Sequence, residues 1–224
     1  MIRIKPIELP TIPPNGGTIT NISFQKQDTN RCSVFLDEEY AFGLHVDIVM
    51  QTGIKKGMML TEEAAKELID EDVYFKAMKR CLDFITNRPR TKKEIDTRLT
   101  QLGVPESVAE RVCTRLDELG LINDTEFARL FSESRVRNKG FGFMRIKQEL
   151  IHKGVAPELA EAAVKQAYPE EEQAKQLSVQ LELAQRKYRK ETDLRAKNHK
   201  ITQHLMRRGF NSGQIMDVIR SQEK

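Results

Sequence analysis

Three segments share one pattern: residues 95–104 are IDTRLTQLGV, residues 146–155 are IKQELIHKGV and residues 201–210 are ITQHLMRRGF. Each has Ile first, Leu four residues later, Gly four residues after that, and then an apolar residue. A spacing of four places Ile and Leu on one helix face. The Gly then suits the left-handed position that closes a helix. Offsets of 51 and 55 residues between the copies indicate a tandem helical array.

Each copy of the pattern lies between two further helical patterns. The preceding helices are marked by Phe75, Met78, Leu82 and Ile85, by Phe127, Leu130 and Phe131, and by Leu177, Leu181, Ala184 and Tyr188. The following helices are marked by Val108, Val112 and Leu116, by Leu159, Ala163 and Val164, and by Ile215, Val218 and Ile219. The sequence therefore predicts three three-helix repeats, over residues 72–122, 123–169 and 170–224.

The residues before the repeats differ in character. Residues 1–16 contain four prolines and are expected to form a flexible arm. Residues 17–71 show β-branched runs separated by turns, with a short helix over 45–52, and predict a sheet of two to four strands. A lobe of this size should depend on the helix that follows. The predicted fold is mainly α, with a small β-rich N-terminal lobe before the three repeats.

Helix ends are marked by capping residues. Thr61 precedes two acidic residues and is predicted to cap a helix, or two in close succession, that runs toward Thr86 and ends before Pro89. Thr91 and Glu94 have the spacing of a capping box and are predicted to start the next helix.

Composition narrows the class of protein. Of 224 residues, 31% are charged, 39% are hydrophobic and none is Trp, which indicates a soluble, folded, helical chain. No apolar stretch suits a membrane span or a signal peptide. Cys32, Cys81 and Cys113 lie too far apart in the sequence for a metal motif or a disulfide framework, which favours the cytoplasm. Cys81 and Cys113 are expected to be buried thiols.

Basic residues concentrate toward the C-terminus. Residues 1–70 hold 7 basic and 10 acidic residues, whereas residues 170–224 hold 12 and 8. Local clusters lie at 129–153, with seven basic residues, and at 186–208, with nine. Such clusters can meet phosphates or an acidic protein surface, although a solvated helix face is the alternative interpretation. Sequence-specific DNA reading is disfavoured, because acidic residues begin the helix after each of the first two glycine turns.

Candidate residues come from these clusters, from the helix break at Pro89 and from the glycine turns. Those predicted to bind a partner are Arg88, Arg90, Arg135, Arg137, Lys139, Arg145, Lys147, Lys153, Arg207 and Arg208. Those predicted to form structural turns are Gly103, Gly140, Gly142, Gly154 and Gly209. Arg88 and Arg90 equally suit the capping of helix-end carbonyls, and Lys153 suits the helix dipole. Phe141 and Phe143 are interpreted as core or staple contacts, with base stacking as the alternative.

Enzymatic chemistry finds no support in the sequence. The four His residues form no ligand set, and no nucleophile–base grouping, phosphate loop or catalytic carboxylate pair is recognisable. No cofactor or metal is predicted.

The repeats can be compared with a known family. Residues 88–90 (RPR), residues 119–124 (LGLIND) before Phe127, and the segment from Arg135 to Val155 resemble the RecX family. The lobe, with residues 34–37 (VFLD), 40–43 (YAFG) and 53–57 (GIKKG), resembles the longer form of that family. Asn123 and Leu121 depart from the common pattern, which has an acid and a Tyr there.

This resemblance implies a regulator of RecA in DNA repair, recombination and the SOS response. Members of the family associate with the RecA filament on single-stranded DNA and restrain strand exchange, ATP turnover and coprotease activity, without a cofactor. The chain is then expected to be a cytoplasmic monomer that can also contact DNA directly. The mode of inhibition stays open between capping, groove binding and disassembly, as does the role of the lobe. A general DNA-binding module that acts without RecA is the alternative function.

Overall fold

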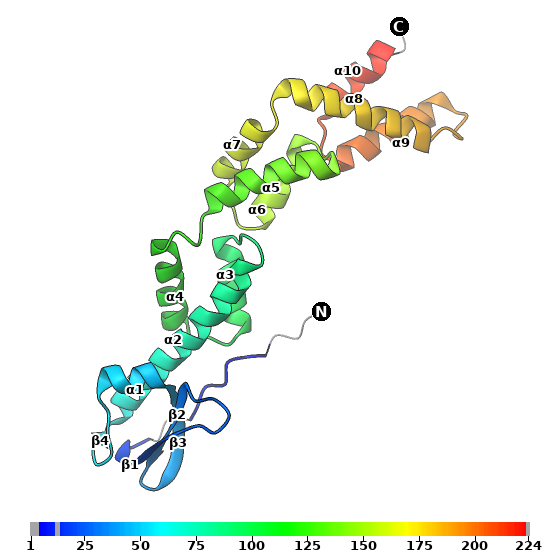
Figure 1. Ribbon diagram of the computed structural model, residues 1–224. Helices are drawn as coiled ribbons and strands as arrows, with labels where there is room; N and C mark the ends of the chain where they lie inside the picture. The colour runs from blue at the N-terminus through cyan, green and yellow to red at the C-terminus, as the bar shows by residue number, and fades with distance from the viewer. Residues whose placement is uncertain (1–4, 12–13, 223–224) are drawn as a thin grey trace. The chain divides into compact units, whose positions relative to one another are not determined.

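The computed structural model describes residues 5–11 and 14–222 (Figure 1). The strands are β1 (Gly17–Phe24), β2 (Arg31–Leu36), β3 (Glu39–His45) and β4 (Met59–Leu60). The helices are α1 (Val46–Thr52), α2 (Glu62–Thr86), α3 (Lys92–Gln101), α4 (Glu106–Glu118), α5 (Asp124–Lys139), α6 (Phe143–His152), α7 (Pro157–Ala167), α8 (Glu170–Lys187), α9 (Leu194–Arg207) and α10 (Ser212–Gln222). The predicted class, mainly α with a small β-rich lobe before three helical repeats, is confirmed.

The sheet is antiparallel, with its strands in the order β3-β2-β1-β4. Buried residues alternate with more exposed ones along the strands, so that one face of the sheet is covered. Ile19, Val34 and Phe42 on that face are all fully buried. The turn between β2 and β3 contains two residues with positive φ, Asp37 and Glu38, which suits a tight hairpin.

A buried ion pair joins the lobe to α2. Asp72, only 3% exposed, accepts hydrogen bonds from Nη1 and Nη2 of Arg31, both at 2.9 Å, and from the backbone N–H of His45. Lys76 also contacts Asp72, at 2.8 Å. Because three groups satisfy this carboxylate, the pair can be buried without leaving an unpaired charge. This contact joins the lobe to α2, the helix on which its small size led us to expect it to depend.

Capping residues set the helix ends that the sequence marked. The Thr61 hydroxyl accepts from the Ala64 N–H, and α2 then continues as one helix to Thr86. At α3 the Thr91 hydroxyl accepts from the Glu94 N–H at 3.2 Å, and the Thr91 N–H donates to the Glu94 carboxylate at 3.4 Å. The predicted capping box is thus present.

Two compact units make up the chain. The first comprises Met1–Pro89 with Ile95–Leu121, and the second comprises Arg90–Glu94 with Ile122–Lys224. The start of α3 therefore belongs with the second unit. The residue bounds predicted for the lobe and the repeats remain a prediction.

The three glycine turns have a common geometry. Gly103, Gly154 and Gly209 all have positive φ. After each Gly, the next residue donates its N–H to the carbonyl of the pattern's Leu, at 3.1 to 3.2 Å. The Ile and Leu of every copy are at most 2% exposed. This agrees with the closing turn that the repeated pattern predicts.

A recurring hydrogen bond joins successive repeats within the second unit. The Thr91 hydroxyl donates to the carbonyl of Lys153 at 2.7 Å, and the Gly142 N–H donates to the carbonyl of Arg208 at 2.8 Å. Thr91 and Gly142 each lie four residues before the Ile of their copy, and both acceptors directly precede the closing Gly. The same joint is therefore built twice, once with a side-chain hydroxyl as the donor and once with a backbone N–H.

A similar bond tethers part of the N-terminal arm to the first repeat. The Ile7 N–H donates to the carbonyl of Leu102 at 2.8 Å, and Leu102 is the residue that precedes Gly103. The arm predicted over residues 1–16 lies partly at 1–4 and 12–13, outside the described residues. In the described part, Ile7 occupies the position on the first repeat that Thr91 and Gly142 occupy on the next two.

The third repeat begins its middle helix earlier than the others. Helices α3 and α6 start three residues before the Ile of the pattern, whereas α9 starts at Leu194, seven residues before Ile201. Asp193 caps α9 by accepting from the Arg195 N–H at 2.9 Å. The extra turn places Lys197 inside the helix, at the position where Thr91 and Gly142 cap α3 and α6.

Candidate partner-binding surface

A shallow, basic hollow of about 520 Å³ lies on the second repeat. We call it the Glu149 hollow, and it is lined by Arg135, Arg145, Gln148, Glu149, His152 and Lys153. Helix α5 contributes the first of these residues, α6 the next four, and the residue that ends α6 the last. Three of the predicted partner-binding residues are thus brought together here.

Two guanidinium groups share one carboxylate at the centre of the hollow. Arg135 donates through Nε to one oxygen of Glu149 at 2.8 Å, and Arg145 donates through Nε to the other at 3.2 Å. Arg145 and Glu149 lie one turn apart on α6, which gives the usual spacing for a helical ion pair. The side chains are 27 to 42% exposed, so the group faces solvent.

Each of these guanidinium groups also covers an aromatic ring. The guanidinium of Arg135 lies 4.4 Å from the centre of the Phe131 ring, and that of Arg145 lies 3.9 Å from the Phe141 ring. Such cation–π contacts orient a planar guanidinium and hold it in place. Phe131 and Phe141 also pack on the core of the second repeat, as predicted, so that the core positions the two arginines.

Lys153 closes one end of the hollow. Its ammonium pairs with Glu94 at 3.0 Å and lies 5.8 Å from the centre of the Phe131 ring. Because its carbonyl also accepts from Thr91, Lys153 contributes to the joint with the start of α3 as well as to the hollow.

Lys147 lies away from the hollow and binds Glu161 of α7 at 2.6 Å. Lys165 binds the same carboxylate at 2.7 Å. These two lysines, through hydrogen bonds and charge, lower the pKa of Glu161 to about 2. The predicted role of Lys147 toward a partner remains a prediction.

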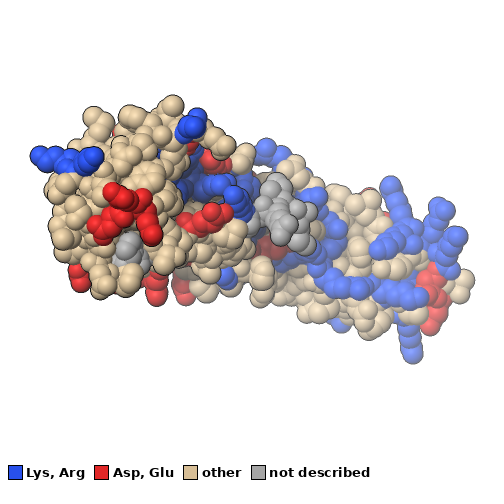
Figure 2. Space-filling model, turned by 90° about the horizontal axis from the view of Figure 1, so that it is seen from below, with Lys and Arg blue, Asp and Glu red and all other residues tan. Residues whose placement is uncertain are grey.

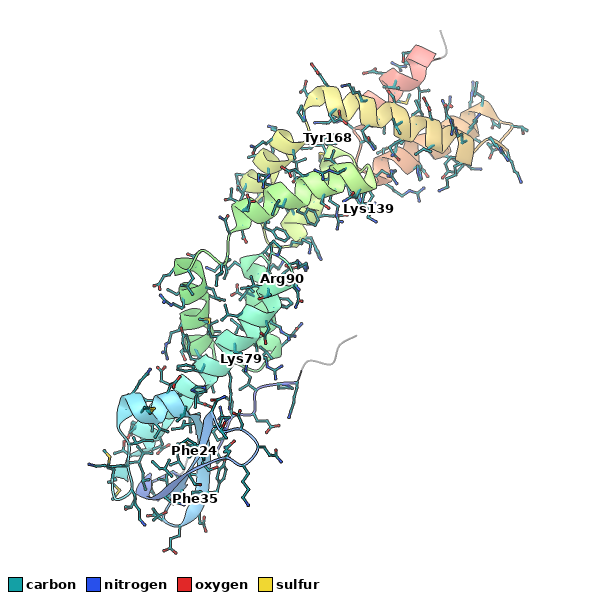
Figure 3. All side chains as sticks on the ribbon, viewed as in Figure 1. Phe24, Phe35, Lys79, Arg90, Lys139 and Tyr168 are labelled. Carbon is teal, nitrogen blue, oxygen red and sulfur yellow. The ribbon has the colours of Figure 1, made fainter. Side chains whose placement is uncertain are left out.

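Arg137 and Lys139 are exposed in the last turn of α5, and Figure 3 labels Lys139 there. Within the part of the chain that the structure describes, neither side chain forms an ion pair. They are therefore the predicted residues most available to a partner, and neutralising them would cost the fold no ion pair.

Arg208 contacts the second repeat across its joint with the third. Its Nη2 donates to the carbonyls of Lys139 and Gly140, and its guanidinium lies 5.4 Å from the centre of the Phe141 ring. Burial, together with the nearby charge of Arg145, lowers the pKa of Arg208. These contacts give Arg208 a structural role, and its binding role stays a prediction.

The remaining predicted residues lie elsewhere. Arg207 is exposed and donates to the carbonyl of Gln203 at 3.2 Å. Arg88 is exposed and donates to the carbonyl of Pro89 at 3.0 Å, while its N–H donates to Ile85 at the end of α2. Arg90 is half-buried. None of these three residues lines the Glu149 hollow.

The predicted turn glycines divide by their surroundings. Gly140 has positive φ and ends α5. Gly142 has φ −76 instead, and its lack of a side chain leaves room for a neighbouring stretch of backbone. A Cβ at Gly142 would overlap the carbonyl of Gly209, and a Cβ at Gly209 would overlap the backbone of Arg145. A Cβ at Gly103, by contrast, would point into open space, with no atom beyond its chain neighbours within 4 Å. Glycine at the second joint therefore permits close backbone packing as well as a turn.

Sequence reasoning missed the acceptor at the centre of the hollow. Glu149 was counted among the acidic residues of the 129–153 cluster and in the family pattern but was not selected as a site residue, although its spacing of four from Arg145 signals an ion pair. Gln148 and His152 also line the hollow and were not selected. The link to Arg135 lies 14 residues away on another helix, and no local spacing indicates it.

A second group of basic side chains lies on the third repeat. Figure 2 shows Lys and Arg gathered around α8 and α9, at the right of the view. The exposed members are Arg186, Lys187, Arg189, Lys190, Arg195, Lys200 and Arg207. Lys200 pairs with Glu191, which lowers the pKa of that carboxyl, and most of the others extend into solvent. This cluster can attract an anion without a formed pocket.

The described residues hold neither a metal-binding cluster nor a membrane-spanning helix. Over residues 5–11 and 14–222, no group of three or more His, Cys, Asp or Glu side chains is placed to hold a metal ion. No helix among the described residues is both long and apolar enough to cross a bilayer. The three cysteines are buried thiols, as expected for Cys81 and Cys113, and burial raises the pKa of Cys81 to about 11.

Four family models match successive parts of the chain. They are the regulatory protein RecX N-terminal domain over residues 17–61 and the first, second and third three-helix domains of RecX over residues 77–116, 123–164 and 170–219. The sequence features that resembled RecX lie within or beside these matches.

Individual relatives agree with the family models. Regulatory protein RecX of Bacillus pumilus is 31% identical over 199 residues, which is 89% of this chain and 74% of the relative. Regulatory protein RecX of Clostridium perfringens strain SM101 is 29% identical over 208 residues, 91% of this chain and 95% of the relative.

Solved structures show the same fold. A crystal structure of regulatory protein RecX has a TM-score of 0.71 at 27% identity and covers 91% of this chain and 98% of its own. The crystal structure of RecX from Lactobacillus salivarius has a TM-score of 0.60 at 26% identity and covers 67% and 97%. From the lobe, the three repeats and these matches together, the chain belongs to the RecX family of regulatory proteins.

Proposed function

We propose that this chain binds the RecA filament on single-stranded DNA and restrains its strand exchange, ATP turnover and coprotease activity. It acts as a cytoplasmic regulator in DNA repair and recombination and catalyses no reaction of its own. Support comes from membership of a family whose relatives are named regulatory proteins. No cofactor is needed for such a role.

The observation that carries the proposal is the basic surface of the second repeat. The Glu149 hollow and the exposed side chains of Arg137 and Lys139 lie on α5 and α6. A surface of this charge suits a partner with exposed carboxylates or phosphates, and a RecA filament on DNA offers both. The contacts of Arg135 and Arg145 with aromatic rings hold their charges in place before binding.

Direct DNA binding without RecA is a second candidate, favoured by the basic cluster around α8 and α9 (Figure 2). A chain that binds DNA mainly through phosphates loses affinity steeply as salt rises. Measuring affinity for single-stranded DNA from low to physiological salt, with RecA absent, tests this candidate. Binding at low salt that falls steeply as salt rises, together with no effect on RecA, would favour it.

The proposal itself is tested by ATP hydrolysis of RecA on single-stranded DNA, titrated with the full chain. We expect the rate to fall, and the amount required to report the mode of inhibition. Inhibition at far less than one chain per RecA indicates capping or disassembly, whereas near-equal amounts indicate binding along the groove. An unchanged rate with the chain in excess would contradict the proposal.

A further inference from the structure

Glu149 is an acidic residue at the centre of a basic surface. Its two carboxylate oxygens accept separately from Arg135 and Arg145, at 2.8 and 3.2 Å. Two guanidinium groups that converge on one carboxylate form a binding site for an anion of that shape. In the free chain, that site is filled by the chain itself.

We propose that Glu149 holds the place of a carboxylate from a protein partner, so that the hollow is an acidic-peptide site kept occupied by its own glutamate. Binding exchanges one carboxylate for another, and the two arginines keep their positions over the rings of Phe131 and Phe141. The identity of the partner as RecA rests on the proposed function. The preference of the hollow for a carboxylate does not depend on that proposal.

The aromatic rings favour a carboxylate over single-stranded nucleic acid. Proteins that bind single strands offer aromatic faces on which bases stack. In the hollow, the face of Phe131 is covered by Arg135, and Phe141 is contacted by both Arg145 and Arg208. Because the guanidinium groups lie over these rings, the hollow presents charge and hydrogen-bond donors where bare aromatic faces would favour bases.

The three charged side chains of the hollow are exposed enough for a partner's carboxylate to reach them. Arg135 is 31% exposed, Arg145 42% and Glu149 27%, so an incoming carboxylate reaches them without opening the core. Ion pairs that face solvent contribute little net stability, since water competes for both partners. Gln148 and His152, exposed beside Glu149, add an amide and an imidazole that can hydrogen-bond a bound peptide.

Glu161 provides a matched comparison on the same repeat. It also lies between two cations, Lys147 and Lys165, at 2.6 and 2.7 Å. Neither lysine offers the planar fork of a guanidinium. Glu161 and its two lysines are not among the residues that line the hollow. Replacing Glu161 therefore removes a similar pair of ion contacts without opening the proposed site.

The test uses the full chain with Glu149→Gln, which keeps the shape of the side chain and removes its charge. Binding of a short labelled oligoglutamate peptide is measured by fluorescence anisotropy, beside a labelled oligodeoxythymidine. We expect Glu149→Gln to bind oligoglutamate about tenfold more tightly than the wild type, because both arginines are then freed from their own carboxylate and each exposed ion pair is worth up to about 1 kcal/mol. Glu161→Gln is expected to match the wild type.

Equal oligoglutamate affinity in Glu149→Gln and the wild type would overturn the inference. A gain for oligodeoxythymidine alone would overturn it too, in favour of nucleic acid. Should Glu149→Gln fail to fold, NMR of the arginine side chains in the wild type replaces it. Oligoglutamate should then shift the Nε signals of Arg135 and Arg145, and unchanged signals would contradict the inference.

The same variants separate this inference from the proposed function. If Glu149→Gln binds oligoglutamate more tightly but neither it nor the wild type slows RecA, the inference stands and the proposed function fails. If the wild type inhibits RecA while oligoglutamate affinity is unchanged in Glu149→Gln, the proposed function stands and the inference fails.

Discussion

Arg145 takes part in two neighbouring contacts through different nitrogens. Its Nε donates to Glu149 in the hollow, while its Nη1 donates to the carbonyl of Arg207 at 3.1 Å, across the joint with the third repeat. Its guanidinium also covers Phe141, on which Arg208 lies as well. One side chain thus links the proposed binding surface to the joint, so variants at Arg145 confound binding with stability.

Tyr168 offers a test of burial at the residue scale. It is fully buried in the core of the second repeat, near the start of α8 (Figure 3), and its hydroxyl has no hydrogen-bond partner among the described residues. Burial, and to a smaller extent the charge of Glu172, raises the pKa of this hydroxyl still further above neutral pH, so the hydroxyl stays protonated. An unsatisfied buried hydroxyl costs free energy that a phenylalanine would not.

We therefore predict that Tyr168→Phe raises the free energy of unfolding by about 1 kcal/mol. Urea unfolding followed by circular dichroism measures the change, with Tyr188→Phe as the control at a half-buried tyrosine. A lower stability in Tyr168→Phe would show that the hydroxyl is hydrogen-bonded after all.

At the scale of the elements, the closing glycines of the repeats differ in how closely another backbone approaches them. Gly103 and Gly209 both have positive φ, so alanine at either position adopts a left-handed conformation that costs about 1–2 kcal/mol. Only at Gly209 would the added Cβ also overlap another backbone, that of Arg145. Moving that backbone adds an overpacking cost of about 1–3 kcal/mol.

Gly209→Ala is thus expected to lower the unfolding free energy clearly more than Gly103→Ala. The two variants are matched in sequence context, and urea unfolding compares them directly. Equal losses of stability would contradict this prediction. They would mean that the backbone at the joint moves aside with no loss of free energy, and that the close approach of Gly142 and Gly209 does not affect stability.

What the sequence predicted at this scale was local. The Ile, Leu and Gly spacing predicted the helix faces and turns, and Thr91 with Glu94 predicted a capping box, because these contacts join residues within one or two helical turns. The contacts of Arg208 could not be predicted, since its acceptors at Lys139 and Gly140 lie 69 and 68 residues away. The hollow was half predicted: its cations stand out by charge, but their pairing with Glu149 depends on how α5 packs on α6.

Across the whole molecule, charge is distributed unevenly along the chain. The first 70 residues carry an excess of acidic side chains, and residues 170–224 an excess of basic ones. Within the first unit, the lobe is joined to α2 through Arg31 and Asp72. The sequence left the role of the lobe open between a second contact with the partner and a brace for the first repeat, and this contact supports the brace.

Function at this scale depends on whether the basic surface of the second repeat meets RecA. Substitutions at Arg137 and Lys139 test this contact best. Both residues are exposed and, within the described residues, form no ion pair that a substitution would break. Reversing their charge near the end of α5 costs at most about 1 kcal/mol each through the helix dipole. Lys79 and Arg80, exposed on α2, provide a control with the same change of charge.

The most direct measurement is inhibition of RecA strand exchange by the wild type and by two double variants of the full chain. We predict that Arg137→Glu with Lys139→Glu needs at least about tenfold more protein for half inhibition, a loss of about 1.4 kcal/mol of binding, with little change in melting temperature. Lys79→Glu with Arg80→Glu should inhibit like the wild type. Equal inhibition by all three proteins would contradict the account, because the basic surface of the second repeat would then not carry the interaction.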